Sequence, residues 1–201
     1  MAHQNRRARL PGDDRGSQIV ELAVTLPLLV VFVVGIFDFG SAFGIKQKVA
    51  NAAREGARIG SQQPSSDLTN IPSSGCVAPA SICAIRDAVN NYLVATHVNS
   101  CGLATANAPT QSALAWTFQS TGTCAGQLTL TVNRGATFAV TLTSPYTSNQ
   151  TVEATSVTLV YPYKWQFNSV VILLVPGANY SSTTPLTAVS VMQNLNRERV
   201  L

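Results

Sequence analysis

The sequence predicts an α+β fold in which one long N-terminal helix leads into a small domain, where a second helix packs on an antiparallel sheet. Three observations predict it. Residues 19–37 form an apolar run with Glu21 as its one ionisable side chain, residues 42–60 show helical periodicity, and the chain beyond Cys101 alternates polar residues with Val, Leu and aromatic residues. About 140 of the 201 residues follow the second of these segments, which is enough for one domain with its own core.

We expect the chain to divide into four parts. Residues 1–16 form a polar leader, residues 17–60 a membrane-spanning helix that continues as an amphipathic helix, residues 61–80 a Ser- and Pro-rich linker, and residues 81–201 the α+β domain. The net charge of +4 is spread thinly, without the dense basic cluster that is typical of nucleic-acid binding.

The apolar run is long enough to span a membrane. At about 1.5 Å of helical rise per residue, residues 19–37 cover about 30 Å, the thickness of the hydrocarbon core of a bilayer. Pro27 should bend this helix only mildly, and membrane helices tolerate such a bend. Four arginines precede the run, whereas Asp38 follows it at once and the next cation is Lys46. The positive-inside rule therefore places the N-terminus in the cytoplasm and the domain across the membrane.

Glu21 lies about one turn inside the apolar run. A charged side chain at mid-bilayer costs about 3 kcal/mol on lenient insertion scales, and less near the edge. Two interpretations follow: the carboxylate reaches back to the interface, or it pairs with a positive group of a neighbouring helix.

Residues 42–60 continue the helix with a different pattern. Apolar and small residues recur at helical spacing on one face: Ile45, Val49, Ala52, Ala53, Gly56 and Ala57. The opposite face carries Gln47, Asn51, Arg54 and Arg58. Glu55 can pair with Arg58 at i,i+3. The small apolar face allows close packing, either against this domain or against another subunit.

Apolar periodicity predicts a second amphipathic helix over residues 81–96. Period-two alternation predicts strands at residues 113–118, 127–133, 137–143, 152–161 and 186–192. Asn133-Arg134-Gly135 lies between two alternating runs and favours a hairpin turn. The apolar run at residues 167–175 is expected to form a short helix packed on the sheet.

Four cysteines lie beyond the membrane segment: Cys76, Cys83, Cys101 and Cys124. There is no CxxC pair, and neither histidine stands at a zinc-like spacing from a cysteine pair, so no metal site is expected. In an exported domain the even count predicts two disulfides. Of the three possible pairings, we favour Cys76–Cys83 with Cys101–Cys124, because neighbours in sequence meet most easily. The alternative is four buried free thiols in a cytosolic domain.

The sequence contains no recognisable catalytic set. GxSxG, HExxH, Walker and GxGxxG patterns are missing, and Asp67, Asp87 and Glu153 are isolated from one another. His97 is the only histidine in the domain, which favours a surface or capping role over that of a ligand or a base. We therefore expect neither an enzyme nor a bound cofactor.

Residues 15–22 resemble a prepilin peptidase site. Such a site has a basic leader, a glycine, and a glutamate as the fifth residue after that glycine; Gly16 and Glu21 match it here. The resemblance implies cleavage between Gly16 and Ser17, with the apolar helix kept on the mature protein. In pilin-like proteins the glutamate is thought to meet the α-amine of another subunit, which would be that of Ser17. Leu22 stands where family members usually have an aromatic residue.

Further motifs extend the resemblance to about residue 60. VELA and LPLL lie in the apolar helix, followed by Gly35-Ile36-Phe37-Asp38-Phe39-Gly40 and then by Asn51-Ala52-Ala53-Arg54-Glu55-Gly56-Ala57-Arg58. In this order they resemble the TadE-like family, the pseudopilins or minor pilins of the tight-adherence (Flp, type IVb) pilus machinery of bacteria. Asp38 stands where the family often has Glu.

The resemblance implies a structural subunit rather than an enzyme. It would be a single-pass protein of the bacterial inner membrane, with a cytoplasmic N-terminus and a periplasmic or extracellular domain, that contributes to type IVb pilus biogenesis. Its partners would be the membrane, the prepilin peptidase, other pilin-like subunits and the pilus assembly platform.

A function of another class is a secreted or membrane-anchored binding domain, or an enzyme, behind a signal peptide or an uncleaved anchor. Gly40-Ser41-Ala42 is an acceptable signal-peptidase site before Phe43. Against a signal peptide, the apolar run exceeds the usual 7–15 residues, and Glu21 does not fit such a region.

Overall fold

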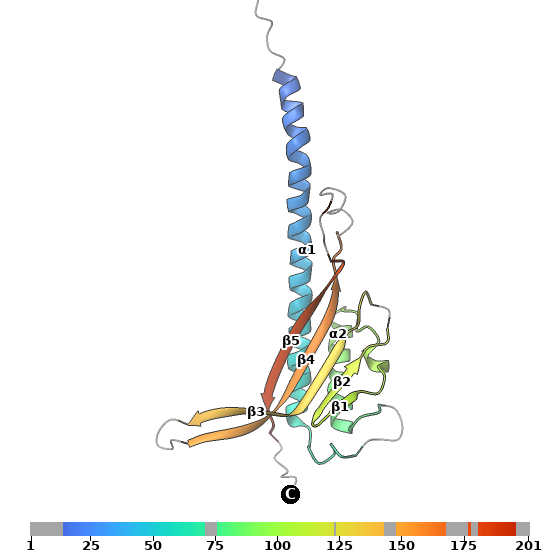
Figure 1. Cartoon of the computed structure of the whole chain (residues 1–201), viewed down its shortest axis with the longest axis vertical. Helices are drawn as coiled ribbons and strands as arrows, with labels where there is room; N and C mark the ends of the chain where they lie inside the picture. Colours follow the sequence, from blue (N-terminus) through green and yellow to red (C-terminus); the bar gives the residue numbers. More distant parts are fainter. Residues whose placement is uncertain are drawn as a thin grey trace, which may run out of the picture.

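The computed structural model describes residues 14–70, 76–122, 124–142, 148–167, 177 and 181–195. A long helix, α1 (Asp14–Gln62), rises out of a small domain (Figure 1). In that domain the second half of α1 and the helix α2 (Ala80–Ala95) pack on one face of a five-stranded sheet. This is the α+β architecture that the sequence predicts.

The sheet is antiparallel throughout, with strands in the order β1-β2-β3-β4-β5. Its strands are β1 (Thr110–Ser112), β2 (Ala115–Gln119), β3 (Thr129–Leu142), β4 (Ser148–Lys164) and β5 (Thr183–Gln193). A short 3₁₀ helix (Leu103–Thr105) lies between α2 and β1. Because strand order follows chain order, every strand pairs with its neighbour in sequence.

The hairpin turn predicted at Asn133-Arg134-Gly135 is wrong. β3 runs through these residues, and a bulge shifts its register against β4 between Asn133 and Ala136. The strands predicted at residues 127–133 and 137–143 are therefore one strand. Residues 143–147, which connect β3 to β4, lie outside the described residues, as does all but Phe167 of the helix predicted at residues 167–175.

Other boundaries differ by a few residues. α1 continues past Gly60 to Gln62. The strand predicted to begin at Ala113 begins instead at Ala115, because Ala113 has a positive φ of 51° and forms part of the tight turn between β1 and β2. No glycine or asparagine marks this turn in the sequence, so turn chemistry could not locate it.

Beyond the bulge, β3 and β4 leave the sheet as a two-stranded arm (Figure 1). The pairing of β2 with β3 ends at Asn133, and that of β5 with β4 ends at Ala154. Phe138 and Val152 face each other across the arm. A two-stranded ribbon alone is only marginally stable in water, so the arm depends on the sheet from which it extends.

The second half of α1 packs through the small-residue face that the sequence indicates. Val49, Ala52, Ala53 and Ala57 are fully buried there. A Cβ added to Gly56 would lie 2.6 Å from Val89 Cγ2 on α2, and one added to Gly60 would lie 2.7 Å from Thr155 Cγ2 on β4. Both distances are too short for real atoms, so α1 approaches α2 and the sheet this closely only because glycine stands at both positions.

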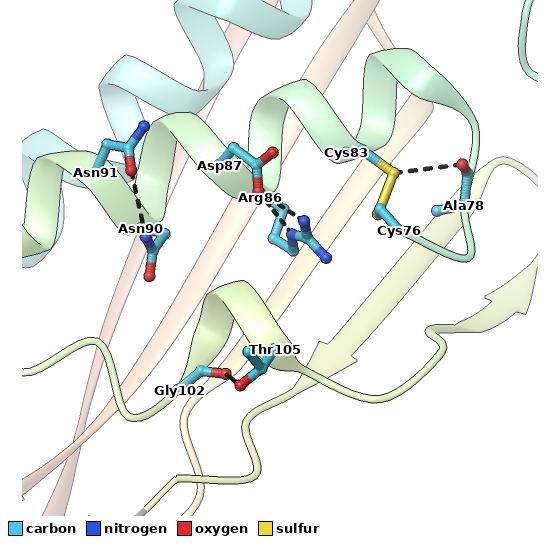
Figure 2. Close-up of polar contacts among 9 residues, drawn as sticks. All are labelled: Cys76, Ala78, Cys83, Arg86, Asp87, Asn90, Asn91, Gly102 and Thr105. Atoms are coloured by element: carbon cyan, nitrogen blue, oxygen red, sulfur yellow. Dashed lines mark hydrogen bonds and ion pairs between the residues drawn. A yellow bond between two sulfur atoms is a disulfide. The ribbon is translucent and has the colours of Figure 1, made fainter. Parts of the chain in front are cut away.

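Two disulfides and one carboxylate organise the chain around α2. Cys76 is bonded to Cys83 in the first turn of α2 (Figure 2). The bond between Cys101 and Cys124 joins the segment after α2 to the loop before β3. This is the pairing that the sequence favoured. Asp67 Oδ2 accepts the N–H of Ser81 at 2.7 Å, so the segment predicted as a linker caps the N-terminus of α2.

Arg134 fastens the C-terminal end of α1 to the sheet. Its side chain is buried, and its guanidinium donates to the carbonyls of Gly60, Gln63 and Pro64 and to Thr155 Oγ1. The last carbonyls of a helix lack intrahelical donors and carry the negative end of its dipole. They therefore compensate a buried cation, although burial lowers the pKa of Arg134 from its usual value.

Gly56→Val should destabilise the domain by about 1–3 kcal/mol, because the new side chain meets Val89 and Val157 in a filled core. Gly44→Val is the matched control, since a Cβ at Gly44 meets no atom within 4 Å while the change in helix propensity is the same. The stability of both variants is measured by urea unfolding in detergent micelles, with circular dichroism as the readout. Equal midpoints for the two variants would contradict the close packing.

Arg134→Met should lower the free energy of unfolding by about 3 kcal/mol, because the carbonyls at the end of α1 lose their buried donor. Arg134→Lys should restore little of it, since a single ammonium cannot reach acceptors spread over α1 and β4 as a planar guanidinium does. Arg54→Met, at an exposed position of α1, is the control. If Arg134→Lys unfolded with the free energy of the wild type, a positive charge at this position would be enough to stabilise the end of α1, and the need for a guanidinium would be refuted.

Candidate functional site

The first half of α1 is an apolar helix that the described part of the domain does not cover (Figure 1). Its large apolar side chains include Val33, which is 42% exposed, and Ile36, which is 72% exposed. An 18-residue window here has a mean hydropathy of 2.7, and none of it is buried. By length and composition, α1 is a helix that can cross a membrane.

Gly16 and Ser17 lie in the first turn of α1, which begins at Asp14, and both are exposed. The first four N–H groups of a helix have no intrahelical acceptor, so the first turn is the one that unwinds most easily. The bond between Gly16 and Ser17, where the resemblance implies cleavage, thus lies in an exposed terminal turn of α1.

Glu21 is exposed among the apolar side chains of the same helix, one turn beyond Ser17. Residues four apart share one face of a helix, so Glu21 and Ser17 project from the same side. Among the described residues Glu21 forms no salt bridge. The backbone carbonyl of Glu21 accepts the Thr25 hydroxyl at 3.0 Å, which satisfies that hydroxyl within the helix. In a bilayer, the carboxylate of Glu21 would need a donor from elsewhere.

Asp38 marks the point where α1 meets the domain. It is 3% exposed, and its carboxylate accepts the N–H groups of Gln166 at 3.0 Å and Phe167 at 3.3 Å, directly after β4. The hydroxyl of Tyr163 donates to the Asp38 carbonyl at 3.4 Å. The sequence shows Asp38 as a flanking charge and as part of a family motif, but not its partners, because these lie more than 120 residues away along the chain.

Aromatic side chains surround this junction. The rings of Phe39 and Trp165 meet edge to face with centroids 5.3 Å apart, and Tyr163 meets Trp165 in the same way at 5.2 Å. Trp165 Nε1 donates to Thr184 Oγ1 at 2.8 Å. Trp and Tyr are enriched where proteins cross the membrane–water interface. The domain therefore contacts α1 through aromatic side chains at the level where the apolar half of α1 ends.

The remaining polar residues of α1 and the domain suggest no chemistry. Arg58 forms the expected ion pair with Glu55 at 2.5 Å, and this hydrogen bond holds the pKa of Glu55 below its usual value. His97 is exposed just after α2. The described residues contain no group of three or more His, Cys, Asp or Glu that could hold a metal ion.

Comparison with known proteins gives one match. A family model described as TadE-like protein matches residues 16–58. The matched segment lies wholly within α1, from the turn with Gly16 and Ser17 to the small-residue face. No curated protein and no solved structure matches the chain.

The family is one of structural pilus components rather than of enzymes. Its match and the uncovered apolar helix together fit a membrane protein associated with a Tad pilus. The chain therefore matches the TadE-like protein family over residues 16–58, which confirms the family that its motifs predict.

Proposed function

We propose that this protein is a TadE-like pseudopilin, anchored in the bacterial inner membrane, that contributes to the assembly of a type IVb pilus. One observation carries the proposal: α1 is an uncovered apolar helix with a carboxylate near its start, and it continues unbroken into the core of the domain. The four arginines of the leader favour a cytoplasmic N-terminus, with the domain periplasmic or extracellular.

The mechanism has three steps. The prepilin peptidase removes residues 1–16, which leaves Ser17 as the new N-terminus. The subunit then waits in the membrane with its helix inserted and its domain outside. Helices of this and other pilin-like subunits finally pack side by side on the assembly platform, with the carboxylate of Glu21 matched to the α-amine of a neighbour.

The geometry of α1 defines what Glu21 can do in such a bundle. After cleavage, Glu21 lies one turn from its own α-amine and near the positive end of the helix dipole. In a bundle, the Glu21 carboxylate can pair instead with the α-amine of a neighbouring subunit. The medium there has a low dielectric constant, so the attraction between the two opposite charges is strong. Only pairing between subunits also sets the stagger between two helices. We therefore assign Glu21 to the contact between subunits.

The contacts of residues 38–42 argue against the alternative hypothesis of a signal peptide that is cleaved before Phe43. Cleavage before Phe43 would remove Asp38 and Phe39, which hold the end of β4 and Trp165. It would also remove Ala42, a residue of the domain core. These contacts support a mature chain that keeps the first half of α1.

The N-terminal sequence of the membrane-extracted protein, from cells that contain the matching prepilin peptidase, should begin at Ser17. The reason is that Gly16 and Glu21 have the spacing of a prepilin site, in an exposed first turn. A start at Phe43 would identify a discarded signal peptide and refute the pilin-like function. An intact Met1 or Ala2 would identify a plain membrane anchor.

Glu21→Ala should leave membrane insertion and cleavage intact but abolish surface pili, because the helices lose their charge match. Electron microscopy of cells that carry the variant in place of the native protein counts the pili. Glu55→Ala is the control, since it removes a carboxylate from the same helix at a position that pairs only with Arg58 among the described residues. Normal piliation with Glu21→Ala would refute the pairing.

A further inference from the structure

One end of the domain faces the apolar half of α1. We call it the proximal end. It comprises residues of three segments: Asp38, Phe39, Phe43, Lys46 and Lys48 of α1; Lys164, the last residue of β4, with Trp165 directly after it; and the residues that follow α2. The contacts of Asp38 with Gln166 and of Phe39 with Trp165 place the end of β4 beside the start of the buried half of α1. Figure 1 shows β4 and β5 meeting at this end.

The proximal end is basic. Lys46 and Lys164 are exposed, and Lys48 donates to the carbonyl of Thr96 just after α2. The one carboxylate described here is that of Asp38, which is buried and accepts two backbone N–H groups. The connection between β4 and β5, residues 165–182, contains no Asp, Glu, Lys or Arg and leaves this balance unchanged.

The other carboxylates of the described domain lie toward its far end. Glu55 follows Asp38 by seventeen residues in α1, about 25 Å along the helix. Asp87 lies between Ile85 and Val89, which contact Gly60 and Gly56, and so lies at about the same level. Asp67 follows the end of α1, and the Glu153 carbonyl accepts from Asn194 next to Ser61. Four arginines, Arg54, Arg58, Arg86 and Arg134, lie toward the same end and balance these four carboxylates. The described domain therefore carries its net positive charge at the proximal end, toward the apolar half of α1.

The lysines lie at or close to the level of the lipid head groups. The head-group layer adds about 5–8 Å to each side of the hydrocarbon core. Lys164 precedes Trp165, whose ring meets that of Phe39 edge to face within one turn of the end of the apolar run. Lys46 is eight residues beyond Asp38, about 12 Å along the helix. Because side chains of a helix tilt toward its N-terminus, here toward the apolar half, the ammonium of Lys46 is expected within about one Debye length of the lipid phosphates at physiological salt.

Two further features complete the surface. Phe39 and Phe43 are both 64% exposed beside the lysines, as expected for aromatic side chains at a membrane interface. A cavity of about 210 Å³ opens at the same end, lined in part by Ile45, Asn99, Lys164 and Gln166. An ammonium and two side-chain amides at one hollow suit the oxygen atoms of a phosphate group.

We propose that the proximal end of the domain rests on the bilayer and binds the head groups of anionic phospholipids, with Lys46, Lys48 and Lys164 as the cations. This inference rests on the membrane anchoring by α1 in the proposed function. It adds a second contact with the membrane, through the folded domain, that selects lipids by charge.

Brominated lipids test the selection in one fixed bilayer composition. The full chain is reconstituted into vesicles of equal parts phosphatidylglycerol and phosphatidylcholine, with bromine on the acyl chains of one lipid or of the other. The chain has two tryptophans, and the fluorescence of Trp165 is obtained by subtracting the signal of the Trp165→Phe variant from that of the wild type. This subtraction removes the contribution of the buried Trp116. Brominated phosphatidylglycerol should quench Trp165 more strongly, and 1 M salt should remove the difference, because it shortens the Debye length to about 3 Å.

In the double variant Lys46→Gln, Lys164→Gln, brominated phosphatidylglycerol and brominated phosphatidylcholine should quench Trp165 equally. The matched control is Arg54→Gln, which removes an exposed cation from the same helix about 12 Å beyond Lys46. Circular dichroism confirms that each variant is folded. Equal quenching by the two lipids in the wild type, or an unchanged difference in the double variant, would overturn the assignment of these lysines.

Alkaline carbonate extraction of the same vesicles separates this inference from the proposed function. A chain that stays in the vesicles but shows no lipid preference refutes head-group binding alone. A chain that is extracted has not inserted through α1, and then the anchored pseudopilin and the lipid contact both fail.

Discussion

One helix has to satisfy two environments, and the rest of the structure depends on how it does so. The first half of α1 presents apolar side chains in all directions, as a lipid environment requires. The second half buries a narrow face of small residues against α2 and the sheet. At the boundary, the buried Asp38 carboxylate binds the backbone just after β4. The domain is thereby tied to α1 at the level where the apolar half ends.

The other end of the domain depends on Arg134. A bulge in β3 carries this side chain to the last carbonyls of α1, and its Nη1 also reaches Thr155, which donates to Asn194 at 2.6 Å. The helix end, two strands and the segment after β5 thus meet around a single guanidinium. Asp38 and Arg134 hold the two ends of the packed half of α1, and the glycines between them set how closely the helix approaches.

Patterns within a few residues predicted most of the fold. The apolar run, the small-residue face and the alternating segments located α1, α2 and most of the strands. Features that depend on distant residues were not predictable in this way. Asn133-Arg134-Gly135 resembles a turn locally, whereas the partners that Arg134 finds when β3 continues are the carbonyls of Gly60 and Gln63 at the end of α1, more than 70 residues away. Motifs also predicted Gly16, Ser17 and Glu21 as site residues, and these stay predictions, because the proposed partner of Glu21 belongs to another chain, which one sequence cannot reveal.

The position of β5 beside α1 has a consequence for the order of events during biogenesis. The N–H of Leu195 donates to the Ser61 carbonyl at 2.9 Å, and β5 completes the sheet against β4. A chain that crosses the membrane from its N-terminal side onward cannot close this domain until Leu195 has emerged. In the orientation proposed above, translocation through Leu195 therefore precedes folding of the domain, whereas the first turn of α1 stays on the opposite side of the membrane, where the proposed peptidase reaches it from the outset. Under the proposed function, cleavage at the start of α1 and folding of the domain are thus independent in time.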